Sequence, residues 1–405
     1  MDEPEFVLLV ENAGGEAYVV GGWVRDTLRG EVPRDKDYVV TGLTPEDFLS
    51  VFPGAVRLGG GFPVYGLRIG GAMCDVAFAR RDVKNGRGYK GFSVSSDRET
   101  PIEDDLFRRD TTINSMALRL RTGAIIDPFG GLYDIERRVI RAVSECFTED
   151  PVRALRAARQ AAEFGFRIEP DTVRLMGMCR DELACEPRER IVREMALALS
   201  AARPSVFFKS LLEAGLLGVT YPQVHALSGA EPYDPCGDFG RSMESLDAAS
   251  SMTCRAEVRF AALCALLGGI PSGPAGAGRE VSRVPALDAW KRSMPLPKRW
   301  TECAEFVIKE MAHVREDADP RETAGLLVRM RRHPIGPDGF AAVMKSWGRT
   351  ADYIEDPERY YRAMGEITGG SIPSRLSGPA RGEWMAERRA EAVSACRSML
   401  KKNGP

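Results

Sequence analysis

The sequence predicts an α+β fold, in which a small α/β head precedes an all-helical neck, body and tail. Residues 1 to about 140 carry short runs of β-branched and aromatic residues, which are typical of strands. After about residue 150 the apolar residues recur at helical spacing. The chain has 405 residues, too many for one core, so we expect two to four domains. The predicted boundaries are 1–140 for the head, 141–222 for the neck, 223–300 for the body and 301–405 for the tail.

Within the head, the residue patterns predict individual elements. Strands are expected at 18–20, 39–40, 64–69, 74–79 and 116–120, and short helices at 44–51 and 106–115. The segment 80–96 is basic, rich in glycine and without an apolar period. We therefore expect a mobile loop there.

The rest of the chain has the pattern of amphipathic helices. They are predicted at 150–164, 171–179, 188–200, 205–214, 300–315, 321–332, 338–347 and 381–401. Pro151 falls at a helix start, where its missing N–H is tolerated. Residues 271–299 are rich in proline and glycine and are predicted to be a linker or an irregular segment.

Composition excludes several classes of protein. The net charge of −2 offers no general attraction for nucleic acid, so an RNA-binding surface must come from local arginine clusters. The longest apolar run, 260–269, is too short to cross a bilayer, and the acidic N-terminus lacks the pattern of a signal peptide. Nine scattered cysteines without a C-x-x-C pair indicate reduced thiols in a cytoplasmic protein, with neither zinc nor disulfides.

The strongest chemical signal is a glycine turn followed by two carboxylates. Gly21 and Gly22 allow a sharp turn that a phosphate can approach, and Arg25 follows one helical turn later. Asp35 and Asp37 are expected on one strand, with both side chains on the same face. Two converging carboxylates are costly unless a cation lies between them, so this pattern predicts Mg²⁺ carrying a nucleoside triphosphate.

Asp75 is a candidate third acid. It lies in an apolar predicted strand, where a buried carboxylate is expensive unless it is paired or bound to a metal. A salt bridge to Arg80 or Arg81 is the alternative interpretation.

Two arginine groups complete the candidate site. Arg108 and Arg109 precede a Thr-Thr-x-Asn sequence and could fork phosphate oxygens, or could belong to an ordinary capped helix. The second group, Glu149-Asp150-Pro-x-Arg153 with Arg156 and Arg159, places three arginines near one helical face. Asp150 and Arg153 together could match the hydrogen-bonding edge of a nucleobase, whereas a solvated basic helix is the alternative.

Taken together, these motifs resemble the bacterial class II tRNA nucleotidyltransferases, the CCA-adding enzymes, from residue 19 to about 222. Their head is shared with bacterial poly(A) polymerases and is similar to the DNA polymerase β superfamily. The resemblance implies that Gly21, Gly22 and Arg25 bind the triphosphate, that Asp35 and Asp37 hold Mg²⁺, and that Asp75 helps to activate the primer hydroxyl. It also implies that Arg109 and Asn114 contact the ribose and phosphate, and that Asp150 and Arg153 hydrogen-bond the base while Glu149 orients them. Arg156 and Arg159 would complete the nucleotide pocket. The basic segment Arg80–Phe92 would be a flexible loop that the enzyme needs when it switches from adding C to adding A. The implied partners are tRNA, CTP and ATP, without DNA or a membrane; the oligomeric state is not indicated.

The chain departs from the family pattern in two places. The most similar subtype carries an HD phosphohydrolase domain after the neck, but residues 260–270 contain no His-Asp pair, and the histidines are only His225, His313 and His333. We therefore expect the HD hydrolase chemistry to be absent. Gln160 replaces the aromatic residue usual after the last arginine of the base-selecting helix, which we expect to be a packing change.

The predicted reaction is template-independent addition of C, C and A to the 3′ end of tRNA, with Mg²⁺ and release of pyrophosphate. An enzyme that adds only A is the alternative, because the loop at Arg80–Phe92 argues against a CC-only enzyme but does not separate the other two. A poly(A) polymerase is less favoured, since those enzymes usually carry a long basic tail. A non-catalytic RNA-binding protein and an HD-type hydrolase are disfavoured by the intact motifs and by the missing histidines.

Overall fold

The computed structural model describes residues 1–59, 62–84, 86, 92–229, 237–268, 285–365 and 367–402. The chain divides into two compact units. The first comprises residues 1–194 and 206–220, and the second comprises 195–205 and 221–405. No helix in the described part of the chain has both the length and the apolar character that crossing a bilayer requires.

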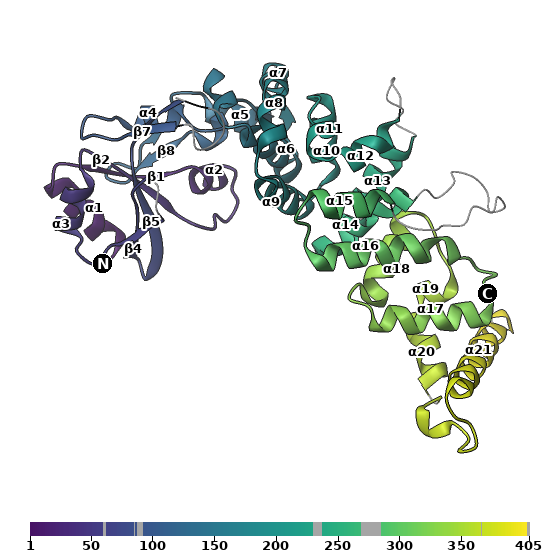
Figure 1. Cartoon of the computed structure of the whole chain (residues 1–405). Helices are drawn as coiled ribbons and strands as arrows, with labels where there is room; N and C mark the ends of the chain where they lie inside the picture. Colours follow the sequence, from purple (N-terminus) through teal and green to yellow (C-terminus); the bar gives the residue numbers. More distant parts are fainter. Residues whose placement is uncertain are drawn as a thin grey trace. The chain divides into compact units, whose positions relative to one another are not determined.

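A mixed sheet forms the centre of the first unit (Figure 1). Its order is β3-β4-β5-β2-β1-β8-β9, with bounds β1 Glu16–Val20, β2 Asp37–Thr41, β3 Val56–Leu58, β4 Val64–Ile69, β5 Ala72–Phe78, β8 Ala117–Arg119 and β9 Ile125–Ile126. Strand β1 pairs antiparallel with β2 on one side and with β8 on the other, whereas β2 and β5 are parallel. This order places β2, which begins at Asp37, in the middle of the sheet.

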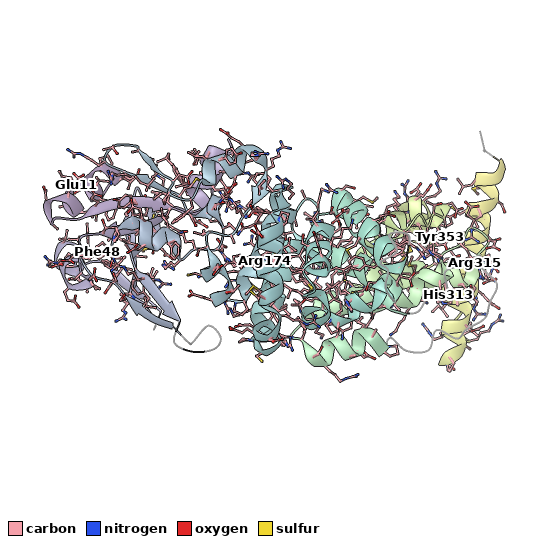
Figure 2. The ribbon with its side chains drawn as sticks, turned by 90° about the horizontal axis from the view of Figure 1, so that it is seen from above. Glu11, Phe48, Arg174, His313, Arg315 and Tyr353 are labelled. Atoms are coloured by element: carbon pink, nitrogen blue, oxygen red, sulfur yellow. The ribbon has the colours of Figure 1, made fainter. Side chains whose placement is uncertain are left out.

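Two helices cover one face of the sheet, α1 Glu3–Asn12 and α3 Pro45–Val51. Helix α3 begins with a capping box, in which the Thr44 hydroxyl accepts from the Asp47 N–H and the Asp47 carboxylate accepts from the Thr44 N–H. Phe48, which is labelled in Figure 2, is fully buried, and its ring packs against Phe52 and Phe78. This aromatic core fixes one face of the sheet, and the carboxylates of the candidate site lie outside it.

The other elements of the first unit are short helices and strand pairs. They are α2 Gly22–Leu28, β6 Arg81–Lys84, β7 Phe92–Ser95, α4 Ile102–Phe107, η1 Thr112–Asn114, α5 Gly131–Arg137, β10 Val139–Ile140, η2 Glu145–Glu149, α6 Val152–Phe164, β11 Arg167–Ile168, α7 Pro170–Met178, α8 Arg180–Cys185 and α11 Leu217–Thr220. The chain passes between the two units within helices α9 Arg188–Leu199 and α10 Ser205–Glu213, and again after Thr220.

The second unit is helical throughout its described residues (Figure 1). Its elements are α12 Pro222–His225, η3 Ala226–Ser228, α13 Asp238–Met252, α14 Ala256–Cys264, η4 Ala265–Gly268, α15 Pro285–Ser293, α16 Lys298–Glu310, η5 Met311–His313, α17 Pro320–Arg332, α18 Gly336–Ser346, α19 Asp352–Glu355, α20 Pro357–Gly365, η6 Gly369–Ser371 and α21 Pro379–Lys402. Tyr353 is buried, and its hydroxyl contacts the backbone of Arg315; the two residues lie side by side in Figure 2. Arg259 is also buried and donates to the carbonyls of four residues, Leu199, Ala201, Ser250 and Thr253. These bonds connect α14 to the chain around residues 199–201 and to the C-terminal end of α13.

The prediction of a strand-rich head before a helical remainder is confirmed, and three local predictions are wrong. The segment 80–96 is not simply a loop, because Arg81–Lys84 pairs antiparallel with Phe92–Ser95; residues 85 and 87–91 lie outside the described part. The helix expected at 106–115 is instead α4, which ends at Phe107, followed by the short η1. The segment expected to be irregular at 271–299 contains α15, while 269–284 also lies outside the described part.

Candidate functional site

The glycine turn follows the end of β1 and leads into α2. Gly21 has φ +69°, in the left-handed region that favours glycine. A Cβ on Gly21 would lie 3.0 Å from Nη1 of Arg109. The turn therefore needs glycine both for its backbone conformation and for the close approach of this arginine.

A polar cleft of about 430 Å³ opens beside this turn. Four predicted residues line it: Gly22, Arg25, Asp35 and Asp37. The other lining residues are Trp23, Asp26, Arg29, Glu31, Val32, Arg34, Glu163 and Phe164. The structure thus brings the glycine turn, the first arginine and both carboxylates to one site, as the sequence predicted.

The two carboxylates do not lie on one strand, contrary to the prediction. Asp37 is the first residue of β2, and Asp35 lies in the preceding loop. Partial removal from water raises the pKa of Asp37; repulsion from Asp75 and Asp35 adds to this rise, and the Arg109 guanidinium opposes it. Asp35 and Asp75 are therefore close enough to Asp37 for their charges to affect its ionisation.

Asp75 lies on β5 directly opposite Asp37 in the parallel β2–β5 pair. It is exposed, so the expectation of a buried acid is wrong: its strand has one face that is open at this point. The alternative partner Arg81 forms an ion pair with Asp104, at 2.6 Å between Nε and Oδ2. Asp75 lies beside Asp37 because the register of the β2–β5 pair places the two residues opposite each other.

Asp35 and Asp37 are the residues that best fit a divalent metal. Both are exposed carboxylates that line the cleft, and hard cations prefer such oxygen ligands. Within the described ranges, three or more His, Cys, Asp or Glu side chains do not gather closely enough to form a metal cluster. The pair therefore offers part of a coordination shell, which the phosphates of a nucleotide could complete.

Arg109 is held in place by a buried acid that the sequence analysis did not single out. Its Nη2 donates to Oδ2 of Asp105 at 2.8 Å, and Asp105 is fully buried. Burial pushes the pKa of Asp105 upward, but Arg109 and Arg108 outweigh it and hold that pKa below its usual value. A carboxylate in the first turn of a helix preceding two arginines is the sequence signal that could have identified it.

Arg25 is fixed on several sides. Its Nη1 donates to Oδ1 of Asn114 at 2.6 Å, while Nε and Nη2 donate to the Asp26 carboxylate. Its guanidinium also lies 4.5 Å from the ring centroid of Phe164, and that of Arg29 lies 4.4 Å from the same centroid. Phe164 ends α6, so this contact joins the cleft to that helix, a link that the sequence analysis missed.

Two of the proposed base-selecting residues lie at the start of α6 and have protein partners. Asp150 accepts from Nη2 of Arg190 at 3.0 and 3.1 Å. Arg153 is 8% exposed and donates to the carbonyls of Cys146 and Arg108, both at 2.6 Å. Glu149 ends η2 immediately before Asp150. The described cleft lining does not include these residues.

The remaining arginines of α6 also meet acids of the protein. Arg156 pairs with Asp110 at 2.7 Å, and Arg159 pairs with Glu194 at 2.7 Å and with Glu163 at 2.8 Å. A solvated basic helix is therefore the wrong interpretation of this face. The charges of Arg156 and Arg159 are matched by carboxylates within the same unit, and Arg153 is held by backbone carbonyls.

Comparison with known proteins extends these local observations to the whole chain. Residues 17–141 match the family model described as "Poly A polymerase head domain", and residues 165–227 match "Probable RNA and SrmB- binding site of polymerase A". The "Multifunctional CCA protein" of Stenotrophomonas maltophilia (strain K279a) is 34% identical over 407 residues, which covers 94% of this chain and 99% of that protein. The protein of the same description from Hahella chejuensis (strain KCTC 2396) is 37% identical over 328 residues, 78% of this chain and 76% of its own.

Solved structures give the same picture at the level of the fold. The CCA-adding enzyme of Bacillus stearothermophilus in complex with CTP matches with a TM-score of 0.65 and 26% identity, over 98% of this chain and 94% of that chain. A CCA-adding enzyme described as apo form II matches with a TM-score of 0.69 at 22% identity, over 98% and 95% of the two chains. The similarity therefore extends over both compact units.

Proposed function

Since this chain belongs to the class II CCA-adding tRNA nucleotidyltransferases, we propose that it adds C, C and A to the 3′ end of tRNA from CTP and ATP, without a nucleic-acid template and with release of pyrophosphate. The observation that carries the proposal is a relative described as a multifunctional CCA protein, 34% identical over 94% of the chain. The cleft supports it, because the glycine turn, Arg25 and the two carboxylates all line it. Addition of A alone is not favoured, since the relatives are described as CCA proteins.

The phosphates of the incoming nucleotide are proposed to lie against the glycine turn. Gly21 and Gly22 let the phosphates approach the backbone, and Arg25 and Arg109 supply guanidinium groups that the carboxylates of Asp26 and Asp105 hold in fixed orientations. Because both arginines are oriented before the nucleotide arrives, little side-chain entropy is lost on binding.

Mg²⁺ is the proposed cofactor, with Asp35 and Asp37 as its ligands. When bound, it would lower the pKa of the tRNA 3′ hydroxyl and neutralise charge on the triphosphate. Asp75 lies opposite Asp37 across the β2–β5 pair and is exposed. Its carboxylate is proposed to accept the proton that the hydroxyl releases.

The base is proposed to be chosen by Asp150 and Arg153, with Glu149 orienting them. Two of the five N–H groups of Arg153 are used in fixing its position, so the others can donate to a base. Asp150 keeps acceptor capacity beyond its two bonds to Arg190 and one to the Val152 N–H, because a carboxylate has about four lone-pair sites. A wrong base that leaves one of these groups unpaired should cost about 1–3 kcal/mol.

The other parts of the chain are proposed to serve tRNA. The division into head, neck, body and tail at 140, 222 and 300 and the absence of HD hydrolase chemistry stay predictions. We propose that tRNA lies along the helical parts through phosphate contacts. A cytoplasmic location fits the free thiols of the described cysteines.

A primer-extension assay tests the proposal. Purified protein is offered tRNA that ends before CCA, and tRNA that lacks only the final A, with labelled CTP or ATP and Mg²⁺. Extension of both is expected; extension of neither would overturn the proposal, and extension of the second alone would make the protein an A-adding enzyme.

The metal assignment needs its own variants. Asp35→Ala combined with Asp37→Ala should abolish extension, and retention of full activity would refute the assignment. Asp171→Ala is the matched control, because this carboxylate is 81% exposed and is not among the residues that line the cleft.

A further inference from the structure

Gln160 is a buried polar residue that the proposed reaction does not use. It lies on α6 and is 1% exposed. Its Nε2 donates to Oδ2 of Asp110 at 3.1 Å, and its Oε1 accepts from the Thr111 hydroxyl at 2.8 Å. The expectation of a simple packing change is therefore wrong, since both ends of the amide have specific partners.

Asp110 is the centre to which Gln160 connects. The carboxylate is 5% exposed and accepts from four donors at 3.1 Å or less: the backbone N–H of Thr111, the Asn114 amide, Nε of Arg156 and the Gln160 amide. The Thr111 hydroxyl lies farther away, at 3.5 Å from Oδ1. Burial pushes the pKa of Asp110 upward, but Arg156 and the hydrogen bonds outweigh it and hold that pKa well below its usual value. A charged carboxylate that is this fully bonded is a rigid anchor.

The same network reaches the cleft. The Asn114 amide donates to Asp110 at 3.1 Å, and its oxygen accepts from Arg25 at 2.6 Å. Arg25 lines the cleft beside the glycine turn. Three consecutive hydrogen bonds thus lead from Gln160 on α6 to the proposed phosphate-binding arginine.

Helix α6 carries the other end of this connection. Arg153 lies seven residues before Gln160, about 10 Å along the helix axis. Because a short helix moves as a rigid body, bonds at Arg156 and Gln160 fix both the rotation and the axial position of Arg153 and of the preceding Asp150.

We infer that Gln160 is a positioning residue, which sets the register between the base-selecting end of α6 and the phosphate-binding turn. This inference rests on the proposed function. If it holds, weakening the Gln160 bonds lets the base-selecting groups shift relative to the bound phosphates. The enzyme then loses discrimination between nucleotides more than it loses affinity for tRNA, because misplacement of about 1 Å is costly for a reacting geometry.

The test is Gln160→Met, which nearly keeps the volume of the side chain and removes its donor and acceptor. The readout is the ratio of kcat/KM for CTP to that for UTP on tRNA ending before CCA, and of ATP to GTP on tRNA lacking the final A. A ratio measured on one preparation does not depend on the fraction of folded enzyme. We expect each ratio to fall by about tenfold or more, with KM for tRNA within about twofold of wild type.

Two further variants separate positioning from stability. Thr323→Val removes a buried hydroxyl that bonds to Arg397 in the second unit, and it should lower stability without changing the ratios. Thr111→Val removes the hydroxyl that donates to Gln160 at 2.8 Å and lies 3.5 Å from Asp110, and it should lower the ratios in the same direction as Gln160→Met. If Gln160→Met does not fold, the ratios measured for Thr111→Val still test the inference.

Unchanged ratios in Thr111→Val and in folded Gln160→Met would overturn the inference, as would an equal loss in Thr323→Val. Failure of wild-type protein to extend either tRNA would instead overturn the proposed function, so the two failures are distinguishable.

Discussion

Replacement of Asp110 by asparagine probes the buried centre of the first unit. The carboxylate receives two hydrogen bonds of 3.1 Å or less on each oxygen: the Thr111 N–H and Asn114 on Oδ1, and Arg156 and Gln160 on Oδ2. In Asp110→Asn one of these oxygens becomes an NH₂ group. This NH₂ group then faces the two donors that the oxygen had accepted from, so both of those hydrogen bonds are lost.

The expected loss of stability follows from those two bonds. A hydrogen bond to a charged group contributes about 1.5–3 kcal/mol, so two contribute about 3–6 kcal/mol. The Arg156 side chain is 41% exposed, so water partly replaces its lost partner. We therefore expect the free energy of unfolding to fall by about 3 kcal/mol at pH 7.

The effect should also depend on pH. The folded protein holds the pKa of Asp110 far below that of the unfolded chain, so the ionised carboxylate stabilises the fold above about pH 4. This contribution is lost as the pH falls below the unfolded value of about 3.9, by about 1.4 kcal/mol per pH unit. The difference between wild type and Asp110→Asn should therefore shrink between pH 5 and pH 3.

Urea denaturation at pH 7, 5 and 3, with hydrogen exchange of α6 to locate the change, measures both quantities. Asp171→Asn is the control; its side chain is 81% exposed, and a change within about 0.5 kcal/mol is expected. A loss below about 1 kcal/mol at pH 7, or a difference that stays constant with pH, would refute the reasoning.

Three further substitutions test other parts of the structure. Asp37→Asn should abolish primer extension, yet it should raise the melting temperature of the metal-free protein at neutral pH. The reason is that the pKa of Asp37 is raised in the folded protein, so its ionised form opposes folding. Calorimetry in EDTA should show that this rise in melting temperature disappears at acidic pH. Arg259→Met removes four hydrogen bonds to backbone carbonyls at about 1 kcal/mol each, and urea denaturation should show a loss of roughly 4 kcal/mol in the second unit; a loss under 1 kcal/mol would contradict this. Gly42→Ala should destabilise the head by about 2 kcal/mol or more, because φ is +76° and a Cβ would lie 2.6 Å from the Gly14 carbonyl oxygen; an unchanged melting temperature would show that the turn relaxes.

Elements with strong local signals could be predicted from the sequence. The strand 64–69 is confirmed residue for residue, because its alternating apolar residues are buried on one face. The helix after Thr44 is confirmed as well, since the residues of its capping box, Thr44 and Asp47, lie within four consecutive positions. The glycine turn and the acidic pair were found because two adjacent glycines, an arginine and two carboxylates occur there at short spacing.

Features that depend on distant partners could not be predicted. The burial of a strand residue depends on which face the neighbouring strands leave open, so Asp75 was expected inside and lies outside. The strands Arg81–Lys84 and Phe92–Ser95 pair with each other although neither has a strong apolar pattern. Gln160 has its partners, Asp110 and Thr111, about fifty residues away, which a single sequence does not reveal.

The order of the strands also has a consequence for how the head folds. Strand β1, near the N-terminus, has β2 as one neighbour and β8, which begins at Ala117, as the other. The chain up to Arg119 must therefore leave the ribosome before β1 is paired on both sides. Such non-local pairing folds slowly, because loop-closure entropy is lost before the contacts form. The cleft is complete only after Phe164, its last lining residue, has been synthesised, and a shorter nascent chain that ends before Arg109 has the glycine turn without this arginine.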